Sequence, residues 1–362
     1  MIRPPDLYDR LKLEVAQGEW AKTIDTQNKT VVTDKGNSFA FDRLLIASGA
    51  DPRPINAVGL ELDNIFYMRT RQHVEAILSA IPKASTALVL GGGLVGFKAA
   101  CGLLRRGLNV TMLVRSRYPL SMQVDARAGE MLLEQLAAHG LHVRVGVEVT
   151  AFEGNGSVSH AHLSDGTRIS CDLAIIGKGV TPATSFVPRD HISVDSGILV
   201  NEHMETTAPD IFAAGDVAES IDRARKQRRV NALWPVAVEQ GRIAGMNMAG
   251  RKVPYKGSLS RNVIRVFDTD ILTAGIVVPP QDDGYREICR HDRRRRTYRK
   301  LVFRDDALVG LVMVNSIEQG GVLVALIQEG IPITGQKESL LHPSFNYAKL
   351  GEAFQRAGRS AS

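Results

Sequence analysis

Gly91-Gly92-Gly93-Leu94-Val95-Gly96 is the stretch that decides the fold. A short apolar run, 87–90, comes directly before it, residues 97–106 have a helical composition, and 109–114 is a second apolar run. We expect a strand, a loop, a helix and a strand, the βαβ setting in which a GxGxxG pattern carries weight. The first glycine makes the tight turn, the second admits a pyrophosphate, and the third lets helix and strand pack closely. The stretch therefore predicts a dinucleotide site, the alternative being a purely structural glycine turn.

The N-terminus of the helix after this loop is expected to bind the phosphates, since its first N–H groups are unpaired and its dipole favours anions. Gly91, Gly93 and Gly96 are accordingly predicted to bind NAD(P). An acidic residue at the end of the second strand would select NAD, but here Arg115 and Arg117 follow Val114. Because a guanidinium offers a planar fork of donors to a phosphate, we expect NADPH to be favoured over NADH. The alternative is that both arginines face solvent.

Other segments show strand and helix patterns. Residues 19–24 and 29–33 are β-like, and apolar 44–47 predicts a strand of a parallel sheet, buried on both faces, that ends at Ser48-Gly49. The further expected elements are a helix over Thr70–Ile81, a helix from Asp125 to Ala138, a hairpin turn at Ser164–Thr167, helical sequence over 231–249 and a helix over 318–329. Residues 255–335 predict a separate α+β domain.

A second group of residues with chemical potential ends a predicted strand at Gly215-Asp216. The small residues before it permit close approach of a ligand, and a carboxylate can accept hydrogen bonds from sugar-like hydroxyls. Taken alone, this is only a strand followed by a turn.

Length and composition exclude several classes of protein. With 362 residues, 44% hydrophobic and 23% charged, the chain suits two or three globular domains. Its apolar runs fall short of the ~20 residues of a membrane span, and no secretory signal is visible, so we expect a cytoplasmic protein that binds no membrane. The net charge of +6 owes much to the run 293–296, which reads as a solvated turn rather than a nucleic-acid site. The three cysteines form no CxxC pair, and no metal site is expected.

The motifs, taken in order, resemble the pyridine nucleotide-disulfide oxidoreductase family in its non-disulfide branch, particularly NADH:rubredoxin reductases and the flavoprotein part of nitrite reductases. The residues that carry the resemblance are Phe41–Ala50, Met68–Thr70, the glycine loop, Gly177–Pro182, Ile211–Asp216 and Leu233–Gly241.

The resemblance implies an α/β fold. It would contain two interleaved Rossmann-like three-layer domains, the FAD-type domain being N-terminally truncated, and a small α+β C-terminal interface domain. The expected divisions are 1–82 and 204–252 for the FAD-type domain, 83–203 for the NAD(P)-binding domain, 253–340 for the C-terminal domain and 341–362 for a tail.

By the same resemblance the cofactors are FAD and NAD(P)H. Gly179 would join the residues that bind NAD(P). Asp216 would bind the ribitol, and Trp234 to Ala237 would lie by the isoalloxazine ring. The complete expected FAD set is Ser48, Gly49, Arg53, Gly215, Asp216, Trp234 and Ala237.

The implied activity is hydride transfer from NAD(P)H to the flavin, with electrons passed on to an acceptor. An acidic rubredoxin- or ferredoxin-like protein is the candidate partner, and a homodimer is the candidate assembly. Hydride transfer demands no general acid or base, so no catalytic residue is named. Lys98 is the candidate near the nicotinamide and flavin, because it stands where the family usually has glutamate.

The family begins with a first GxGxxG unit that binds the ADP half of FAD, and this sequence starts beyond that unit. The rival hypotheses are therefore a non-catalytic NAD(P)-binding remnant, or a subunit that needs another chain for FAD binding. His142, His160, His162 and His203 are expected to be surface histidines rather than proton shuttles.

Overall fold

A computed structural model describes residues 6–281, 284–335 and 337–345. The chain forms two compact units. The first contains residues up to Gly49, Pro182–Ser220 and Ala232–Tyr255, and the second contains Ala50–Thr181, Ile221–Asn231 and the chain from Lys256 onward. Of the tail expected over 341–362, residues from 346 onward lie outside the described part.

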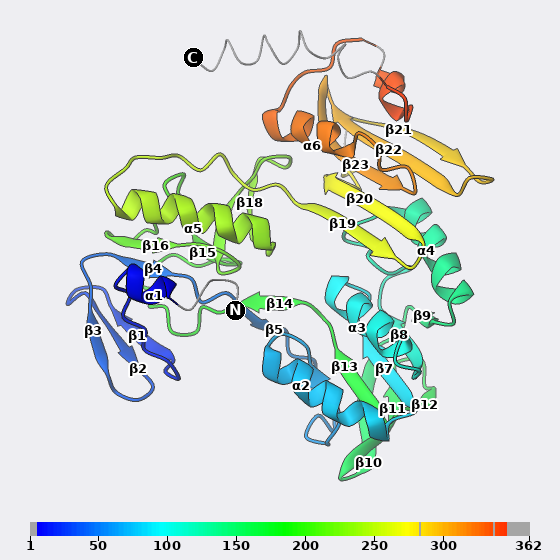
Figure 1. Ribbon diagram of the computed structural model, residues 1–362, viewed down its shortest axis with the longest axis horizontal. Helices are drawn as coiled ribbons and strands as arrows, with labels where there is room; N and C mark the ends of the chain where they lie inside the picture. Colours follow the sequence, from blue (N-terminus) through cyan, green and yellow to red (C-terminus); the bar gives the residue numbers. More distant parts are fainter. Residues whose placement is uncertain (1–5, 282–283, 336, 346–362) are drawn as a thin grey trace. The chain divides into compact units, whose positions relative to one another are not determined.

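The first unit holds a small antiparallel sheet, a parallel strand pair and one long helix (Figure 1). The two β-like runs predicted within 19–33 form the paired strands β1 and β2, and a third strand completes their sheet in the order β1-β2-β3. The elements are α1 (Leu7–Arg10), β1 (Ala21–Asp25), β2 (Thr30–Thr33), β3 (Ser38–Ala40), β4 (Leu44–Ile46), β15 (Ile198–Leu199), β16 (Ile211–Ala213), β17 (Ala218–Asp222, whose end enters the second unit) and α5 (Trp234–Met248).

Strand β4 pairs in parallel with β16, which confirms the parallel sheet predicted for 44–47. Burial is less complete than expected, because Ile46 is buried while Leu44 and Leu45 are only half-buried. The reason is that the sheet formed by β4 and β16 has two strands, so fewer neighbours cover its residues. The core of this unit gathers apolar residues from β16, α5 and the segment 187–204.

The second unit contains the parallel sheet that the glycine pattern predicted. Its strand order is β6-β13-β7-β8-β9, with α3 packed on the central strands and α4 against β9. The elements of this part are β5 (Ala50–Pro52), β6 (Ile65–Tyr67), α2 (Arg71–Ala80), the short helix Ile81–Lys83, β7 (Thr86–Leu90), α3 (Leu94–Leu104), β8 (Asn109–Val114), α4 (Ala126–Ala138), β9 (His142–Val145), β13 (Leu173–Ile176) and β14 (Val180–Pro182).

Two helices begin where the sequence indicated. The Thr70 hydroxyl accepts a hydrogen bond from His73 N at 3.2 Å, and His73 Nδ1 accepts one from Thr70 N at 3.4 Å, which caps α2 reciprocally. Asp125 Oδ1 accepts a hydrogen bond from Ala128 N at 3.1 Å and starts α4.

An antiparallel excursion interrupts this α/β region between β9 and β13. It comprises β10 (Val149–Asn155), β11 (Ser157–Leu163) and β12 (Arg168–Ser170). The turn between β11 and β12 falls at 164–167, as predicted.

The C-terminal part is an antiparallel sheet of order β19-β20-β23-β22-β21 with α6 packed on β20 and β23 (Figure 1). Its elements are β19 (Arg261–Val266), β20 (Thr269–Gly275), β21 (Tyr285–Asp292), β22 (Thr297–Arg304), β23 (Ala307–Val314), α6 (Gly320–Glu329) and the short helix Lys337–Leu341, with β18 (Gln227–Arg229) earlier in the chain. The mixed α/β class with a parallel sheet and an α+β C-terminal part is thus confirmed.

The parallel sheet and the C-terminal sheet share one hydrophobic core. A buried polar link joins them as well: Tyr298 Oη donates to Asp125 Oδ2 at 2.7 Å, and Lys300 Nζ lies 3.3 Å from the same oxygen and 2.7 Å from Glu287. Asp125 therefore starts α4 and accepts contacts from β22 at the same time.

Candidate functional site

The glycine loop has the geometry of a phosphate cradle. Gly91 adopts φ +109°, and a Cβ there would lie 2.5 Å from the Gly177 carbonyl oxygen. A Cβ on Gly96 would lie 2.1 Å from the Gly91 carbonyl oxygen, so this position packs the helix onto the loop. Gly93 has open space around it and caps α3 without any side-chain hydrogen bond. The first N–H groups of α3 thus remain available to an anion.

The middle glycine and the segment after β8 hold the loop from the other side. A Cβ on Gly92 would lie 2.8 Å from Val114 Cγ2, and Leu120 N donates to the Gly92 carbonyl at 2.7 Å. These contacts were not predicted from the sequence. Three successive glycines were the available signal, because the GxGxxG pattern explains only the first and the third of them.

Arg115 and Arg117 follow β8 and are both exposed. The Arg115 side chain is 82% exposed, and its Nε lies 3.8 Å from Glu148 Oε2. Ser116 donates its hydroxyl hydrogen to the Tyr118 carbonyl at 2.8 Å. Arg115 is consequently free to move toward a ligand but already has a weak anionic neighbour.

Glu148 is the residue that sequence reasoning missed at this edge of the sheet. Its Oε1 accepts a hydrogen bond from Lys178 Nζ at 2.7 Å. This hydrogen bond, together with the charges of Lys178 and Arg115, lowers the pKa of Glu148. Glu148 follows β9 and Lys178 follows β13, so two strand ends meet beside Arg115. Lys178 belongs to the motif Gly177–Pro182, whereas no local pattern pointed to Glu148.

The turn after β13 packs against the glycine loop. Gly177 N donates to the Leu90 carbonyl at 2.7 Å, and Gly179 adopts φ +90° with open space around it. Arg53 lies at this turn: its N donates to the Gly179 carbonyl at 2.9 Å and its Nη2 to the Val180 carbonyl at 3.3 Å. The predicted NAD(P) residue Gly179 and the predicted FAD residue Arg53 are therefore direct neighbours.

The remaining predicted FAD residues gather in the first unit, at the carboxyl ends of the paired strands β4 and β16. Gly49 and Gly215 both have positive φ, +72° and +84°. Ser48 Oγ donates to the Ala183 carbonyl at 2.8 Å, and Asp216 is half-buried just beyond Gly215. Glycines at both strand ends place no side chain there, and glycine permits the close approach of a ligand to the backbone.

Helix α5 contacts the same edge. A Cβ on Gly215 would lie 3.5 Å from Ala237 Cβ, and Gly215 N donates to Gln240 Oε1 at 2.8 Å. Gln240 is buried and its Nε2 donates to Ser220 Oγ at 3.1 Å. Trp234, at the start of α5, is 66% exposed. Gln240 belongs to the motif Leu233–Gly241, but the sequence indicated no role for it. In the structure it holds the Gly215 turn.

The other candidate side chains lie elsewhere. Lys98 is exposed on α3. Cys171 is buried, and burial raises the pKa of its thiol to about 12, whereas Cys101 is half-buried and Cys289 exposed. Across residues 6–281, 284–335 and 337–345, no group of three His, Cys, Asp or Glu side chains could hold a metal ion. No helix in these ranges is both long enough and apolar enough to cross a bilayer.

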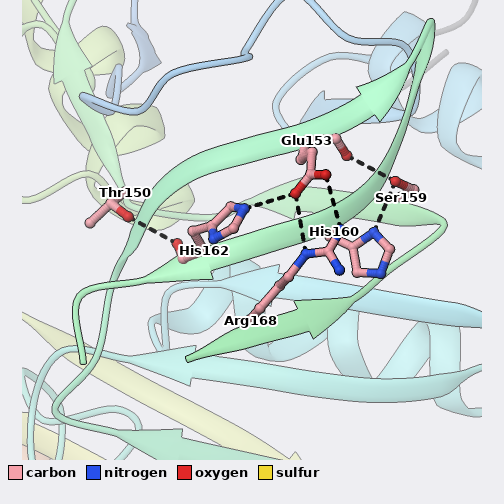
Figure 2. Close-up of polar contacts among 6 residues, drawn as sticks. All are labelled: Thr150, Glu153, Ser159, His160, His162 and Arg168. Carbon is pink, nitrogen blue, oxygen red and sulfur yellow. Dashed lines mark hydrogen bonds and ion pairs between the residues drawn. The ribbon is translucent and has the colours of Figure 1, made fainter. Parts of the chain in front are cut away.

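The two hairpin histidines take part in surface contacts, as expected (Figure 2). His162 Nε2 lies 2.9 Å from Glu153 Oε2, and Arg168 Nη2 donates to the other oxygen of Glu153 at 3.0 Å. His160 Nδ1 lies 3.0 Å from Ser159 Oγ. The hydrogen bond from His162, followed by that from Arg168, lowers the pKa of Glu153.

Comparison with known proteins adds a family context. The sequence profile described as pyridine nucleotide-disulphide oxidoreductase matches residues 8–241, and that described as the rubredoxin NAD+ reductase C-terminal domain matches residues 261–331.

Among curated relatives, the chain is 29% identical over 340 residues to a nitrite reductase [NAD(P)H] of Bacillus subtilis, covering 93% of this chain and 41% of that protein. It is 28% identical over 275 residues to an NADH-rubredoxin oxidoreductase of Clostridium acetobutylicum, covering 76% and 67%. The chain spans less than half the length of the first two relatives it matches.

Among solved structures, the covalent putidaredoxin reductase–putidaredoxin complex matches with a TM-score of 0.85 at 24% identity, over 99% of this chain and 85% of that chain. This likeness concerns the fold.

Proposed function

Because the chain belongs to the pyridine nucleotide-disulphide oxidoreductase family, we propose that it is an FAD-dependent NAD(P)H:acceptor oxidoreductase. The observation that carries the proposal is the glycine loop, in which Gly91 and Gly96 pack too tightly for any side chain while Gly93 stays open beside the start of α3. Such a loop suits a pyrophosphate. Bound FAD would supply the chemistry of the reaction, as acceptor of a hydride from the nicotinamide.

We propose the edge formed by β4, β16 and α5 as the flavin site. Gly49 and Gly215 adopt positive φ and carry no side chain, Asp216 brings a carboxylate, and Trp234 offers an exposed aromatic face. We propose that Asp216 accepts hydrogen bonds from the ribitol hydroxyls and that Trp234 lies by the ring system. The buried Gln240 would hold the Gly215 turn in the required conformation.

For the nucleotide, we propose a preference for NADPH. Arg115 and Arg117 are exposed and follow β8, where a 2′-phosphate would be recognised. Among the residues that the structure describes, Arg115 has one ion pair, the long one with Glu148, which leaves donors of its guanidinium for a ligand. Lys98, which is exposed on α3, is proposed as a cation that raises the flavin potential.

For the acceptor, we propose a small acidic redox protein of the rubredoxin or ferredoxin type. The match of residues 261–331 to the rubredoxin NAD+ reductase C-terminal domain supports it, as does the exposed arginine turn 293–296. Opposite charges would speed association and make it sensitive to salt.

The test is flavin-dependent oxidation of NADPH. The purified chain, supplied with excess FAD, should reduce ferricyanide with NADPH as donor, and FAD titration should quench flavin fluorescence. Asp216→Ala should weaken FAD binding, whereas Asp195→Ala, which removes an exposed carboxylate elsewhere in the same unit, should not. Absence of any FAD-dependent oxidation would contradict the proposal.

A further inference from the structure

Two arginines stand directly opposite each other on the antiparallel strands β21 and β22. Arg290 and Arg299 are cross-strand partners. Arg299 is 3% exposed, whereas Arg290 is exposed. Burial lowers the pKa of Arg299, and the charge of Arg290 lowers it further, against the opposing effect of Glu318. Like charges facing each other across a strand pair are destabilising, so this arrangement calls for a counter-charge.

The guanidinium of Arg299 is only partly satisfied. Its Nε donates to Ser316 O at 2.8 Å and Ser316 Oγ at 3.0 Å. Its Nη2 donates to Glu318 O at 2.8 Å and Glu318 Oε2 at 3.1 Å. Its Nη1 is buried and has no hydrogen-bond partner within the described part of the chain. A buried charged donor without an acceptor costs free energy, so a bound acceptor at Nη1 of Arg299 would stabilise the protein.

A cavity of about 230 Å³ adjoins these arginines. Three arginines line it, Arg290, Arg295 and Arg299, together with Thr297 and Asn315 as further polar groups. Its volume lies below the roughly 300–1,000 Å³ typical of sites for drug-sized ligands. The space therefore suits an anion of a few heavy atoms rather than a nucleotide or a protein segment.

The two carboxylates at the cavity are already engaged. Asp292 Oδ1 accepts the backbone N–H groups of Arg294 and Arg295 at 3.0 and 3.1 Å and so shapes the turn. Glu318 lies on Nη2 of Arg299. Neither carboxylate accepts a hydrogen bond from Nη1 of Arg299, and the cationic side chains outnumber the anionic ones in the lining.

We propose that this cavity binds a small oxyanion, of phosphate or carboxylate chemistry, between Arg290 and Arg299. The anion accepts hydrogen bonds from Nη1 of Arg299 and from Arg290, because a guanidinium pairs with carboxylate and phosphate oxygens through two parallel N–H groups. The exposed side chains of Arg290 and Arg295 rearrange to admit it. The site lies wholly in the second unit and does not depend on the proposed oxidoreductase activity.

The test measures thermal unfolding of the full chain against sodium phosphate and, separately, against sodium malonate. Potassium chloride holds the ionic strength constant, so that general salt effects are equal in all samples. The variants are Arg290→Gln and the matched control Arg294→Gln. Both remove one exposed positive charge near the same turn, but Arg294 does not line the cavity.

Without an oxyanion, Arg290→Gln should melt at or above the temperature of the unmodified protein, because the cross-strand repulsion is gone. With phosphate or malonate, the unmodified protein and Arg294→Gln should gain thermal stability. The apparent affinity of Arg290→Gln for the oxyanion should be at least about tenfold weaker, the effect of losing one charge-assisted hydrogen bond. The arm with the larger gain identifies whether phosphate or carboxylate is the preferred chemistry.

Two outcomes would overturn the site. One is an equal gain in all three proteins, which would reduce the effect to general stabilisation by the salt. The other is no gain with either oxyanion in the unmodified protein. Because Arg290 is exposed, its replacement does not threaten the fold, and the comparison stays interpretable.

Discussion

Replacing Arg115 with glutamine should weaken binding of NADP+ and leave binding of NAD+ nearly unchanged. The side chain is 82% exposed, so its contact with a 2′-phosphate belongs at the lower end of the range for hydrogen bonds to charged groups, about 1.5 kcal/mol. That free energy corresponds to roughly a tenfold higher Kd. The change removes the charge and keeps a polar side chain of similar reach.

Glu148→Gln should act in the opposite direction. Arg115 Nε and Glu148 Oε2 are 3.8 Å apart, a separation at which two charges in water interact by about 1 kcal/mol. Both side chains are more than two-fifths exposed, so the coupling is worth at most this much. Removal of the carboxylate should therefore strengthen NADP+ binding by up to about fivefold at low salt, and the gain should shrink as salt screens it.

Direct titration of the oxidised nucleotides by calorimetry measures both effects without needing the flavin. The double variant Arg115→Gln/Glu148→Gln completes a thermodynamic cycle, and the part of the Glu148 effect that acts through Arg115 should disappear in it. The control is Arg105→Gln, an exposed arginine at the far end of α3. Equal weakening of NADP+ and NAD+ by Arg115→Gln, or weaker NADP+ binding after Glu148→Gln, would refute the reasoning.

Gly96→Ala should lower the free energy of unfolding by about 1–3 kcal/mol in denaturant melts, because its Cβ would lie 2.1 Å from the Gly91 carbonyl oxygen; an unchanged midpoint would contradict this close packing. At pH 8, a thiol reagent should label Cys289 in the native protein and reach Cys171 only after unfolding. The reason is that burial raises the pKa of Cys171 to about 12 and the thiolate is the reactive form. Mass spectrometry of the labelled peptides measures both sites, and equal labelling of the two in the native protein would contradict the prediction. In flavin-loaded protein, Lys98→Glu should lower the flavin reduction potential, because a negative charge disfavours the anionic reduced flavin. Potentiometry measures the change, and an unchanged potential would show that Lys98 does not influence the flavin.

The sequence predicted those features that depend on local pattern. Residues 87–114 form the expected strand, loop, helix and strand, and α2 and α4 begin directly after Thr70 and Asp125, where the sequence predicted helices. Each of these rests on neighbours within a few positions, where periodicity and capping chemistry are informative.

What the sequence did not reveal are contacts between distant strand ends. Glu148 and Lys178 are 30 residues apart in the chain, and they meet because β9 and β13 end at the same edge of one sheet. Gln240 reaches Gly215 across 25 residues for a comparable reason, since α5 packs on β16. The cavity beside Arg299 could not be predicted either, because it depends on the register of β21 on β22, which pairs Arg290 with Arg299. Of the arginine run 293–296, only Arg295 lines this cavity.

The link from Asp125 to Tyr298 and Lys300 makes the C-terminal sheet hard to exchange as a module. A chimera that grafts another C-terminal domain after Tyr255 would retain the start of α4, because Asp125 would still accept the Ala128 N–H. It would, however, leave that nearly buried carboxylate without its tyrosine donor and its lysine counter-charge, unless the graft supplied both in the same positions of the second strand from the sheet edge. Successful recombination within such proteins should therefore require residues 125, 298 and 300 to be inherited together.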